Sequence, residues 1–142
     1  MNKHKTLVII GAGGHGRVVA DCAESTAVYH EIIFLDDCFS TRKNNRHWPI
    51  VGPIDSWTEH SDNADFIVAV GSNALRESLL QRLFATESYI ATLIHPTAFV
   101  SSHCDIAQGV VIFANAVVNV GARIDEGCII NTAATIDHDC HI

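Results

Sequence analysis

Residues 94–142 read IHPTAF, VSSHCD, IAQGVV, IFANAV, VNVGAR, IDEGCI, INTAAT, IDHDCH and a final Ile142 when they are written in groups of six. The first position of every group is aliphatic and β-branched: Ile94, Val100, Ile106, Ile112, Val118, Ile124, Ile130, Ile136 and Ile142. The fifth position is small and apolar: Ala98, Cys104, Val110, Ala116, Ala122, Cys128, Ala134 and Cys140. A period of six fits neither an α-helix nor an isolated strand. It predicts a parallel β-helix, in which each coil buries its apolar positions against the neighbouring coils.

The composition limits the class of protein. The chain has 142 residues, enough for one domain or two small ones that share an interface. Apolar residues make up 48% and charged residues 18%, which argues against disorder. The formal charge of −7, with no cluster of Lys or Arg, argues against a nucleic-acid partner.

The amino terminus, MNKHKTLVIIGAGG, resembles a signal peptide only superficially. Its apolar run is short and continues into a glycine-rich turn with Arg17 and Asp21. No stretch reaches the roughly 18 apolar residues of a membrane span. We therefore predict a soluble, cytoplasmic protein without a membrane partner.

The cysteines follow the repeat. Three of the five, Cys104, Cys128 and Cys140, occupy the fifth position of their groups, where a small apolar residue is needed. An odd number without a C-x-x-C pair indicates neither a disulfide framework nor a zinc finger. We expect these three to pack inside the β-helix.

Residues 5–93 alternate as α/β units do. Apolar runs predict strands at 6–10, 32–35, 66–70 and 89–93, and helical spacing predicts helices at 17–24 and 73–84. The second helix carries Leu75, Leu79, Leu80 and Leu83 on one face. We expect residues 41–47 to form a loop, residues 49–54 a hairpin or edge element, and Trp48 and Trp57 to cover the sheet. The period changes at 93/94 without a flexible linker, so we predict domains 1–93 and 94–142 that pack together.

A glycine motif follows the first predicted strand. Gly11, Gly13 and Gly16 form G-x-G-x-x-G at the start of a helix, where backbone N–H groups can bind a phosphate. Asp36 and Asp37 close the next strand, where an acidic residue would hold a ribose hydroxyl. The motif indicates a nucleotide or nucleotide-sugar site, and a merely tight turn is the alternative. About ninety residues with some four strands are too few for two mononucleotide halves, which disfavours NAD, as does the polar His15 inside the motif.

A second glycine, Gly71, follows the third predicted strand and should lie beside the first loop, at the ligand-binding edge of an open α/β sheet. Ser72 and Asn73 come next, and either could contact a ligand or cap the following helix.

The densest polar cluster is residues 137–141, DHDCH. As a bare string it could bind a metal, but the repeat turns Cys140 inward, away from His138. A histidine beside Asp139 at a coil corner can act as a general base, because its ordinary pKa of about 6.5 lies near neutrality. An ordinary surface histidine is the alternative.

Taken together, IIGAGGHG, FLDD, AVGSN, LIHPTAFVS and NTAATIDHDCHI resemble the sugar O-acyltransferases of the sialic-acid O-acetyltransferase and bacillosamine-type N-acetyltransferase family. The resemblance implies a Rossmann-like domain followed by a left-handed parallel β-helix, assembled as a homotrimer. It implies acetyl-CoA as donor, bound between neighbouring β-helices, and a sugar nucleotide or sialic acid as acceptor. It places Gly13, Gly14, His15, Asp36, Asp37 and Gly71 at the acceptor, and makes His138 the catalytic base with Asp139 raising its basicity. It implies no metal.

Family members continue with further coils beyond this point, whereas here eight groups of six are present. We therefore expect an incomplete β-helix and a C-terminally truncated chain, a truncation that can abolish activity. The leading hypothesis is an acetyltransferase acting on a sugar or UDP-amino sugar in surface-glycan biosynthesis. Three alternatives stay open: a non-catalytic sugar-nucleotide-binding protein, a zinc-dependent β-helix of the carbonic-anhydrase type, and an NAD-dependent oxidoreductase.

Overall fold

The computed structural model describes residues 5–142, so the first four residues of the stretch considered as a signal peptide lie outside it. The amino-terminal part is built on one six-stranded sheet. In spatial order its strands are β3 (Asn44–Asn45), β4 (Trp48–Gly52), β2 (Glu31–Leu35), β1 (Thr6–Ile10), β5 (Ala64–Val68) and β6 (Tyr89–Ile90). All neighbours pair in parallel except β3 and β4, which form an antiparallel hairpin at the edge.

The two helices cover opposite faces of this sheet. Four of the five residues of β1 are fully buried, as expected for a central parallel strand covered on both sides. Leu7 and Ile9 pack towards α1 (Gly14–Ser25), and Val8 and Ile10 pack towards α2 (Asn73–Phe84). The alternating α/β units predicted from the sequence are confirmed.

Helix α2 differs from the prediction at one position. Leu79, Leu80 and Leu83 are buried as expected, but Leu75 is 48% exposed. Leu75 lies in the first turn of the helix, which Ser72 caps by accepting a hydrogen bond from the Leu75 backbone N–H at 3.5 Å. The apolar cluster of this face is formed from the later turns of the helix, so the amino-terminal turn stays open to solvent.

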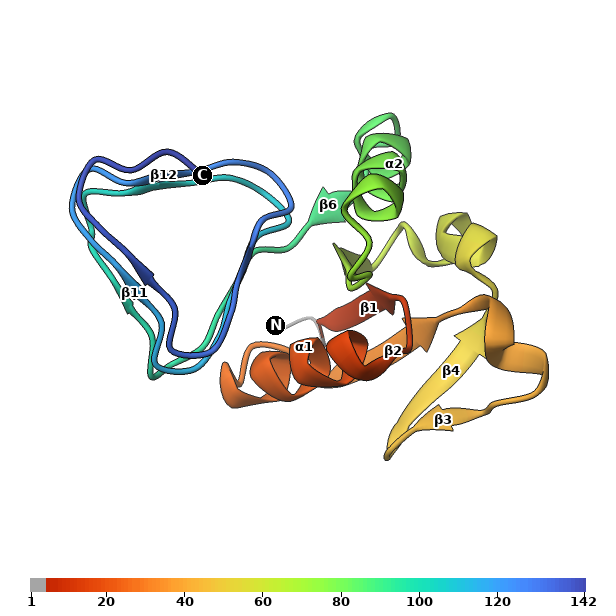
Figure 1. Cartoon of the computed structure of the whole chain (residues 1–142). Helices are drawn as coiled ribbons and strands as arrows, with labels where there is room; N and C mark the ends of the chain where they lie inside the picture. The colour runs from red at the N-terminus through yellow and green to blue at the C-terminus, as the bar shows by residue number, and fades with distance from the viewer. Residues whose placement is uncertain (1–4) are drawn as a thin grey trace.

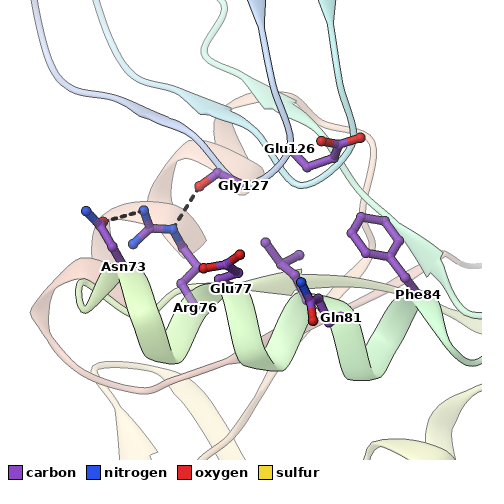
Figure 2. Close-up of a pocket in the computed structure, with 8 residues that line it drawn as sticks. Asn73, Arg76, Glu77, Gln81, Phe84, Glu126 and Gly127 are labelled. Carbon is purple, nitrogen blue, oxygen red and sulfur yellow. Dashed lines mark hydrogen bonds between the residues drawn. The ribbon is translucent and has the colours of Figure 1, made fainter.

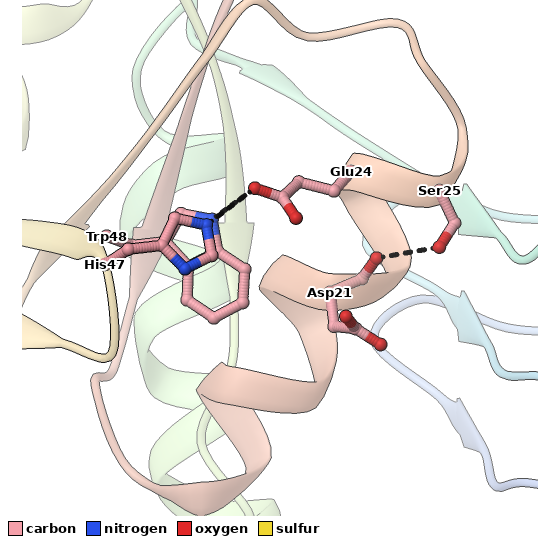
Figure 3. A network of polar contacts seen from close by, with 5 residues as sticks. All are labelled: Asp21, Glu24, Ser25, His47 and Trp48. Carbon is pink, nitrogen blue, oxygen red and sulfur yellow. Dashed lines mark hydrogen bonds and ion pairs between the residues drawn. The ribbon is translucent and has the colours of Figure 1, made fainter.

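Residues 37–60 contain more regular structure than expected. Two 3₁₀ helices, η1 (Asp37–Ser40) and η2 (Ile54–His60), flank the β3–β4 hairpin. The prediction of a loop at residues 41–47 is wrong for Asn44–Asn45, which pairs with β4. The hairpin expected within residues 49–54 forms instead between this pair and β4, and Ile54 begins η2. Glu24 of α1 holds the hairpin by accepting hydrogen bonds from His47 and from the Trp48 indole N–H (Figure 3). Trp48 and Trp57 are buried against the sheet, as predicted, and they lie on its opposite faces.

The carboxyl-terminal part is a parallel β-helix of two-residue strands. They are β7 (Leu93–Ile94), β8 (Phe99–Val100), β9 (Asp105–Ile106), β10 (Val111–Ile112), β11 (Val117–Val118), β12 (Arg123–Ile124), β13 (Ile129–Ile130) and β14 (Thr135–Ile136). Each strand pairs with the one eighteen residues along, as in the pairing of Val111 with Ile129, so three groups of six make one coil. The coils stack into three parallel sheets, which form the sides of the triangle in Figure 1.

The period of six governs side-chain direction and backbone conformation alike. First-position residues such as Ile112 and Ile124 are buried inside the triangle, and Cys104 and Cys128 of the fifth position pack against them. Cys140 is half-buried. The fourth position of each group lies at a corner of the triangle, and the sequence pattern did not single it out. Its backbone is left-handed, with φ between 57° and 75°, in Gly109, Asn115, Gly121, Gly127, Ala133 and Asp139.

The two parts pack directly on each other, as the absence of a linker predicted. Leu93, Val111 and Phe113 of the β-helix belong to the same apolar cluster as α1 and the sheet. At a neighbouring corner the side chain of Leu80 in α2 lies where side chains at Gly109 and Gly127 would otherwise be. Arg76 donates a hydrogen bond from Nε to the Gly127 carbonyl at 2.8 Å (Figure 2). One face of the triangle is therefore covered by the α/β part. Across residues 5–142, no helix combines the length and the apolar character needed to cross a membrane.

Candidate active site

The glycine loop joins β1 to α1, and its four glycines have two different roles. Gly11 has φ +107°, and a side chain there would lie 2.7 Å from the Ala69 carbonyl oxygen. A side chain at Gly16 would overlap the Gly11 carbonyl. Gly13 and Gly14, in contrast, face open space with no described atom within 4 Å of an added Cβ. Packing explains Gly11 and Gly16, whereas Gly13 and Gly14 keep the positive end of α1 accessible to an anionic ligand.

Asp36 binds the glycine loop itself. Its Oδ2 accepts a hydrogen bond from the Ala12 backbone N–H at 2.7 Å, and its Oδ1 accepts one from the Cys38 N–H at 2.9 Å. Burial acts to raise the pKa of Asp36, but the hydrogen bonds from Cys38 and Ala12 and the charge of Arg42 outweigh it, so the pKa is lowered. Asp36 is thus an ionised carboxylate that fixes the loop.

Asp37 points elsewhere. Its Oδ1 accepts a hydrogen bond from the Ile54 N–H at 3.1 Å, at the start of η2, and its side chain lies at the exposed rim of the sheet. The two neighbouring aspartates therefore serve different contacts, one on the glycine loop and one on the segment after β4.

Asn45 holds the other side of the glycine loop, and the sequence analysis missed it. The side chain is fully buried, and its Nδ2 donates to the carbonyls of Ala12 and Gly13 at 3.1 and 3.2 Å. Its Oδ1 accepts from Arg17 Nε at 3.1 Å and from Arg42 at 2.9 Å. Arg42 adds a hydrogen bond to the Ala12 carbonyl at 2.8 Å. Two asparagines in a charged, turn-like segment give no local sign that one of them is buried.

His15 lies at the contact between the glycine loop and the β-helix. Its ring packs edge-on against Phe113 of the β-helix, with the ring centroids 5.8 Å apart. Its Nε2 is buried and has no hydrogen-bond partner among residues 5–142. Burial, and then the charge of Arg76, lower the pKa of His15, so the imidazole is neutral at neutral pH.

Gly71 completes this edge of the sheet. An added Cβ there meets no described atom within 4 Å, so Gly71 is open in the same way as Gly13. Arg76 donates to the carbonyls of Val70 and Gly71 at 2.9 and 3.3 Å, which fixes the loop that Gly71 belongs to.

Between α2 and the β-helix corner lies a cavity of about 390 Å³ (Figure 2). It is lined by Asn73, Arg76, Glu77, Leu80, Gln81, Phe84, Glu126 and Gly127.

His138 and Asp139 form a hydrogen-bonded pair on the β-helix. His138 Nδ1 lies 2.8 Å from Asp139 Oδ2, and both side chains are more than 70% exposed. The hydrogen bond with Asp139, then its charge, and the charge of Asp137 raise the pKa of His138. Because Asp139 occupies Nδ1, the opposite ring nitrogen, Nε2, faces solvent and is available to exchange a proton.

The structure brings the loop residues together but leaves the histidine pair apart from them. Gly13, His15, Asp36 and Gly71 surround one edge of the sheet, beside the β7–β10–β13 face of the triangle. The 137–140 turn follows β14, which pairs with β11, and precedes His141, which pairs with β12. The corner between β11 and β12 is the one farthest from the α/β part in Figure 1. Within one chain, therefore, His138 does not reach the glycine loop.

No group of three or more His, Cys, Asp or Glu side chains is placed to hold a metal ion within the part of the chain that the structure describes. The fold and the site together define a class: a Rossmann-like α/β part joined to a parallel β-helix built from six-residue repeats. The PglD N-terminal domain family matches residues 6–83, more than half of the chain. The chain belongs to this family.

Proteins of known function or structure resemble the chain over most of its length. A UDP-N-acetylbacillosamine N-acetyltransferase from Bacillus subtilis (strain 168) is 38% identical over 113 residues, which are 78% of this chain and 52% of that protein. The acetyltransferase domain of PglB from Neisseria gonorrhoeae FA1090, in complex with acetyl coenzyme A, is 42% identical with a TM-score of 0.91. A mutant of perosamine N-acetyltransferase from Caulobacter crescentus, in complex with CoA and GDP-perosamine, is 28% identical with a TM-score of 0.87.

The two structures align with 96% of this chain but with only 66% and 64% of their own. The chain thus spans about half the length of the curated relative and about two thirds of these structures.

Proposed function

We propose that the protein is an acetyl-CoA-dependent acetyltransferase that acts on a sugar or a UDP-linked amino sugar in surface-glycan biosynthesis. The observation that carries the proposal is the pairing of His138 Nδ1 with Asp139 at 2.8 Å, which leaves Nε2 exposed. A UDP-N-acetylbacillosamine N-acetyltransferase and a perosamine N-acetyltransferase among the similar proteins support amino-sugar acetylation. A complex of PglB with acetyl coenzyme A supports the donor.

In the proposed reaction His138 acts as general base. Its Nε2 takes the proton of the acceptor amine or hydroxyl while that group attacks the thioester carbonyl of acetyl-CoA. The tetrahedral intermediate collapses, the carbon–sulfur bond breaks, and the CoA thiolate takes the proton back from the imidazolium. Asp139 holds the tautomer with the proton on Nδ1 and stabilises the imidazolium formed on the way. The products are the acetylated sugar and free CoA.

The acceptor nucleotide is proposed to bind at the glycine loop. Gly13, Gly14 and Gly71 leave open space beside the positive end of α1, which suits a diphosphate. Asp36 already binds the loop, so we propose that it shapes the pocket and that the exposed Asp37 faces the ligand. His15 is proposed as the wall of the pocket towards the β-helix.

We propose a homotrimer in which neighbouring chains share each site, because His138 is remote from the glycine loop of its own chain. The outward-facing Phe99 of β8 is 59% exposed, and it lies on a side of the triangle that the α/β part does not cover. A neighbouring copy packed on this side would bring its glycine loop towards the His138 corner. The left-handed turn of the β-helix, the division at 93/94 and a cytoplasmic location are proposed on the family resemblance.

Acetyl transfer tests the function. The wild-type chain, incubated with acetyl-CoA and UDP-amino sugars or sialic acid, should release CoA, measured with a thiol reagent. His138→Ala should abolish this release. His141→Ala is the matched control, because His141 is also exposed and hydrogen-bonded to a carboxylate, at 2.7 Å to Asp125. Transfer that survives in His138→Ala would refute the assigned base.

Mixing variants tests the shared site. His138→Ala lacks the base, and Gly13→Leu fills the open space of the glycine loop, so each should be inactive alone. Mixed oligomers, formed by refolding the two variants together, should regain part of the activity because some sites combine an intact loop with an intact base. No recovery, in assemblies shown by light scattering to be mixed, would contradict sharing.

A non-catalytic sugar-nucleotide-binding protein is the second candidate. The separation of the glycine loop from His138 within one chain favours it for an unassembled chain. It predicts calorimetric binding of a UDP-sugar that Gly13→Leu abolishes, with no CoA release by any oligomeric form.

A further inference from the structure

One corner of the β-helix stacks three fourth-position residues from successive coils: His103, Gly121 and Asp139. The Gly121 N–H donates to the His103 carbonyl at 3.0 Å, and the Asp139 N–H donates to the Val120 carbonyl at 3.1 Å. The backbone of Gly121 therefore lies next to Asp139, the residue that binds His138, in the preceding coil. The conformation of this corner fixes where the Asp139 carboxylate can lie.

Gly121 leaves room for that carboxylate. A Cβ added at Gly121 would overlap Asp139 Oδ1, and the next nearest atom, Asp139 Cγ, lies 3.3 Å away. The carboxylate thus occupies the position that a side chain at 121 would take. Its other oxygen, Oδ2, makes the 2.8 Å contact with His138 Nδ1.

The left-handed backbone alone does not require glycine in this position of the repeat. Gly121 has φ +74°, but Asn115 and Ala133 adopt φ 59° and 57° at equivalent corners with side chains present. Gly121 differs from these two corners because the Asp139 carboxylate of the next coil occupies the position that its Cβ would take.

We propose that Gly121 is a positioning residue for catalysis, which seats the Asp139 carboxylate so that it orients His138. This inference deepens the proposed function and rests on it for the catalytic role of His138. A side chain at position 121 would push the carboxylate away from Nδ1 while leaving both members of the pair in the chain. His138 would then lose the partner that holds its tautomer.

The charged groups that act on His138 are Asp139 and Asp137. Asp137 remains after the substitution, so the effect of position 121 runs through Asp139 alone. The hydrogen bond and the charge of Asp139 are the main causes that raise the pKa of His138. Gly121→Ala should therefore lower this pKa towards its ordinary value.

The test is a histidine NMR titration of the full chain without substrate, with the His138 signal assigned by its loss in His138→Gln. Gly121→Ala should shift the titration to lower pH. Gly109→Ala is the matched control: its φ of +75° is nearly the same, and its added Cβ would lie 3.1 Å from a movable Leu80 methyl instead of a carboxylate. This control should leave the titration of His138 unchanged.

A double variant separates positioning from general damage. In an Asp139→Ala background, Gly121→Ala should cause no further shift, because the displaced group is already absent. If Gly121→Ala alone fails to fold, the same double variant should restore folding by removing the overlap. An unchanged titration in Gly121→Ala, an equal shift in the Asp139→Ala background, or no rescue of folding would overturn the inference.

The catalytic part has its own readout. In the acetyl-transfer assay Gly121→Ala should lower kcat and move the acid limb of the pH profile to lower pH, whereas a structural defect would lower activity at every pH alike. If the titration shifts as expected but the wild-type chain transfers no acetyl group, the proposed function fails and the placement of Asp139 by Gly121 stands.

Discussion

Replacing Asn45 with alanine should destabilise the glycine loop more than any other single change of a polar side chain near it. The fully buried amide makes four hydrogen bonds, two to loop carbonyls and two from guanidinium groups. A net contribution of about 1 kcal/mol per bond would give about 4 kcal/mol. The Ala12 carbonyl keeps its bond from Arg42 and the Gly13 carbonyl keeps the helical bond from the Arg17 N–H, so neither is left unpaired. We therefore expect a loss of about 3 kcal/mol.

The free energy of unfolding, measured in urea, should fall by this amount in Asn45→Ala. The midpoint of thermal unfolding should fall by about 10 °C for a chain of this size. Asn44→Ala is the control, because this neighbouring asparagine is exposed, and its loss should cost less than about 0.5 kcal/mol. Equal effects of the two substitutions would refute the view that Asn45 holds the loop.

Three further predictions follow from the contacts around the site. Arg76→Lys should lower the free energy of unfolding by about 2 kcal/mol in urea, because a single ammonium cannot bond the Gly127 carbonyl, the Val70 carbonyl and the Asn73 side chain at once as the guanidinium does. Arg123→Lys changes only an exposed ion pair and should cost under about 0.5 kcal/mol, so equal losses would contradict the role of Arg76. Gly16→Ala should prevent stable folding, measured by circular dichroism, because its side chain would overlap the Gly11 carbonyl. Gly13→Ala should fold normally and weaken UDP-sugar binding, and a normally folded Gly16→Ala would show that this packing argument is wrong. Asp36 has a lowered pKa in the folded protein, so its contribution to stability is present above its unfolded pKa of about 3.9 and is lost as the pH falls towards the folded value. In urea, the difference in unfolding free energy between wild type and Asp36→Asn should shrink below about pH 4, and a constant difference would exclude this linkage.

The strands, the helices and the β-helix could be predicted because their signals are local or periodic. A strand buried on both faces, such as β1, is a continuous apolar run, and a coil of three repeats returns to the same sheet every eighteen residues. The exposed Leu75 and the strand Asn44–Asn45 could not be predicted in this way. Whether a first-turn leucine is covered, or a polar pair forms an edge strand, depends on what other segments pack there.

Residues of the candidate site likewise differ in whether the sequence can predict them. Motifs predict Gly13, Asp36 and His138 as site residues, because phosphate binding and proton transfer restrict residue type and spacing; their roles stay a prediction. The contacts of Asn45 could not be predicted, since three of its four hydrogen bonds join residues 28 to 33 positions away in the sequence and nothing in its neighbourhood marks it as buried. The two different contacts of Asp36 and Asp37 were likewise invisible to a pattern that treats them as one acidic pair.

The sequence by itself therefore determined the architecture, since a six-residue period that buries its first and fifth positions has one economical solution, a stack of parallel coils. Only the tertiary structure decided which groups act on one another. It put the glycine loop and the His138 corner on opposite sides of the β-helix, and it seated the Asp139 carboxylate on Gly121. The physical reason is that the eighteen-residue spacing of the coils stacks Gly121 and Asp139 but does not say where the carboxylate lies, and that contacts between the two parts of the chain join residues whose separation in the sequence carries no information about their separation in space.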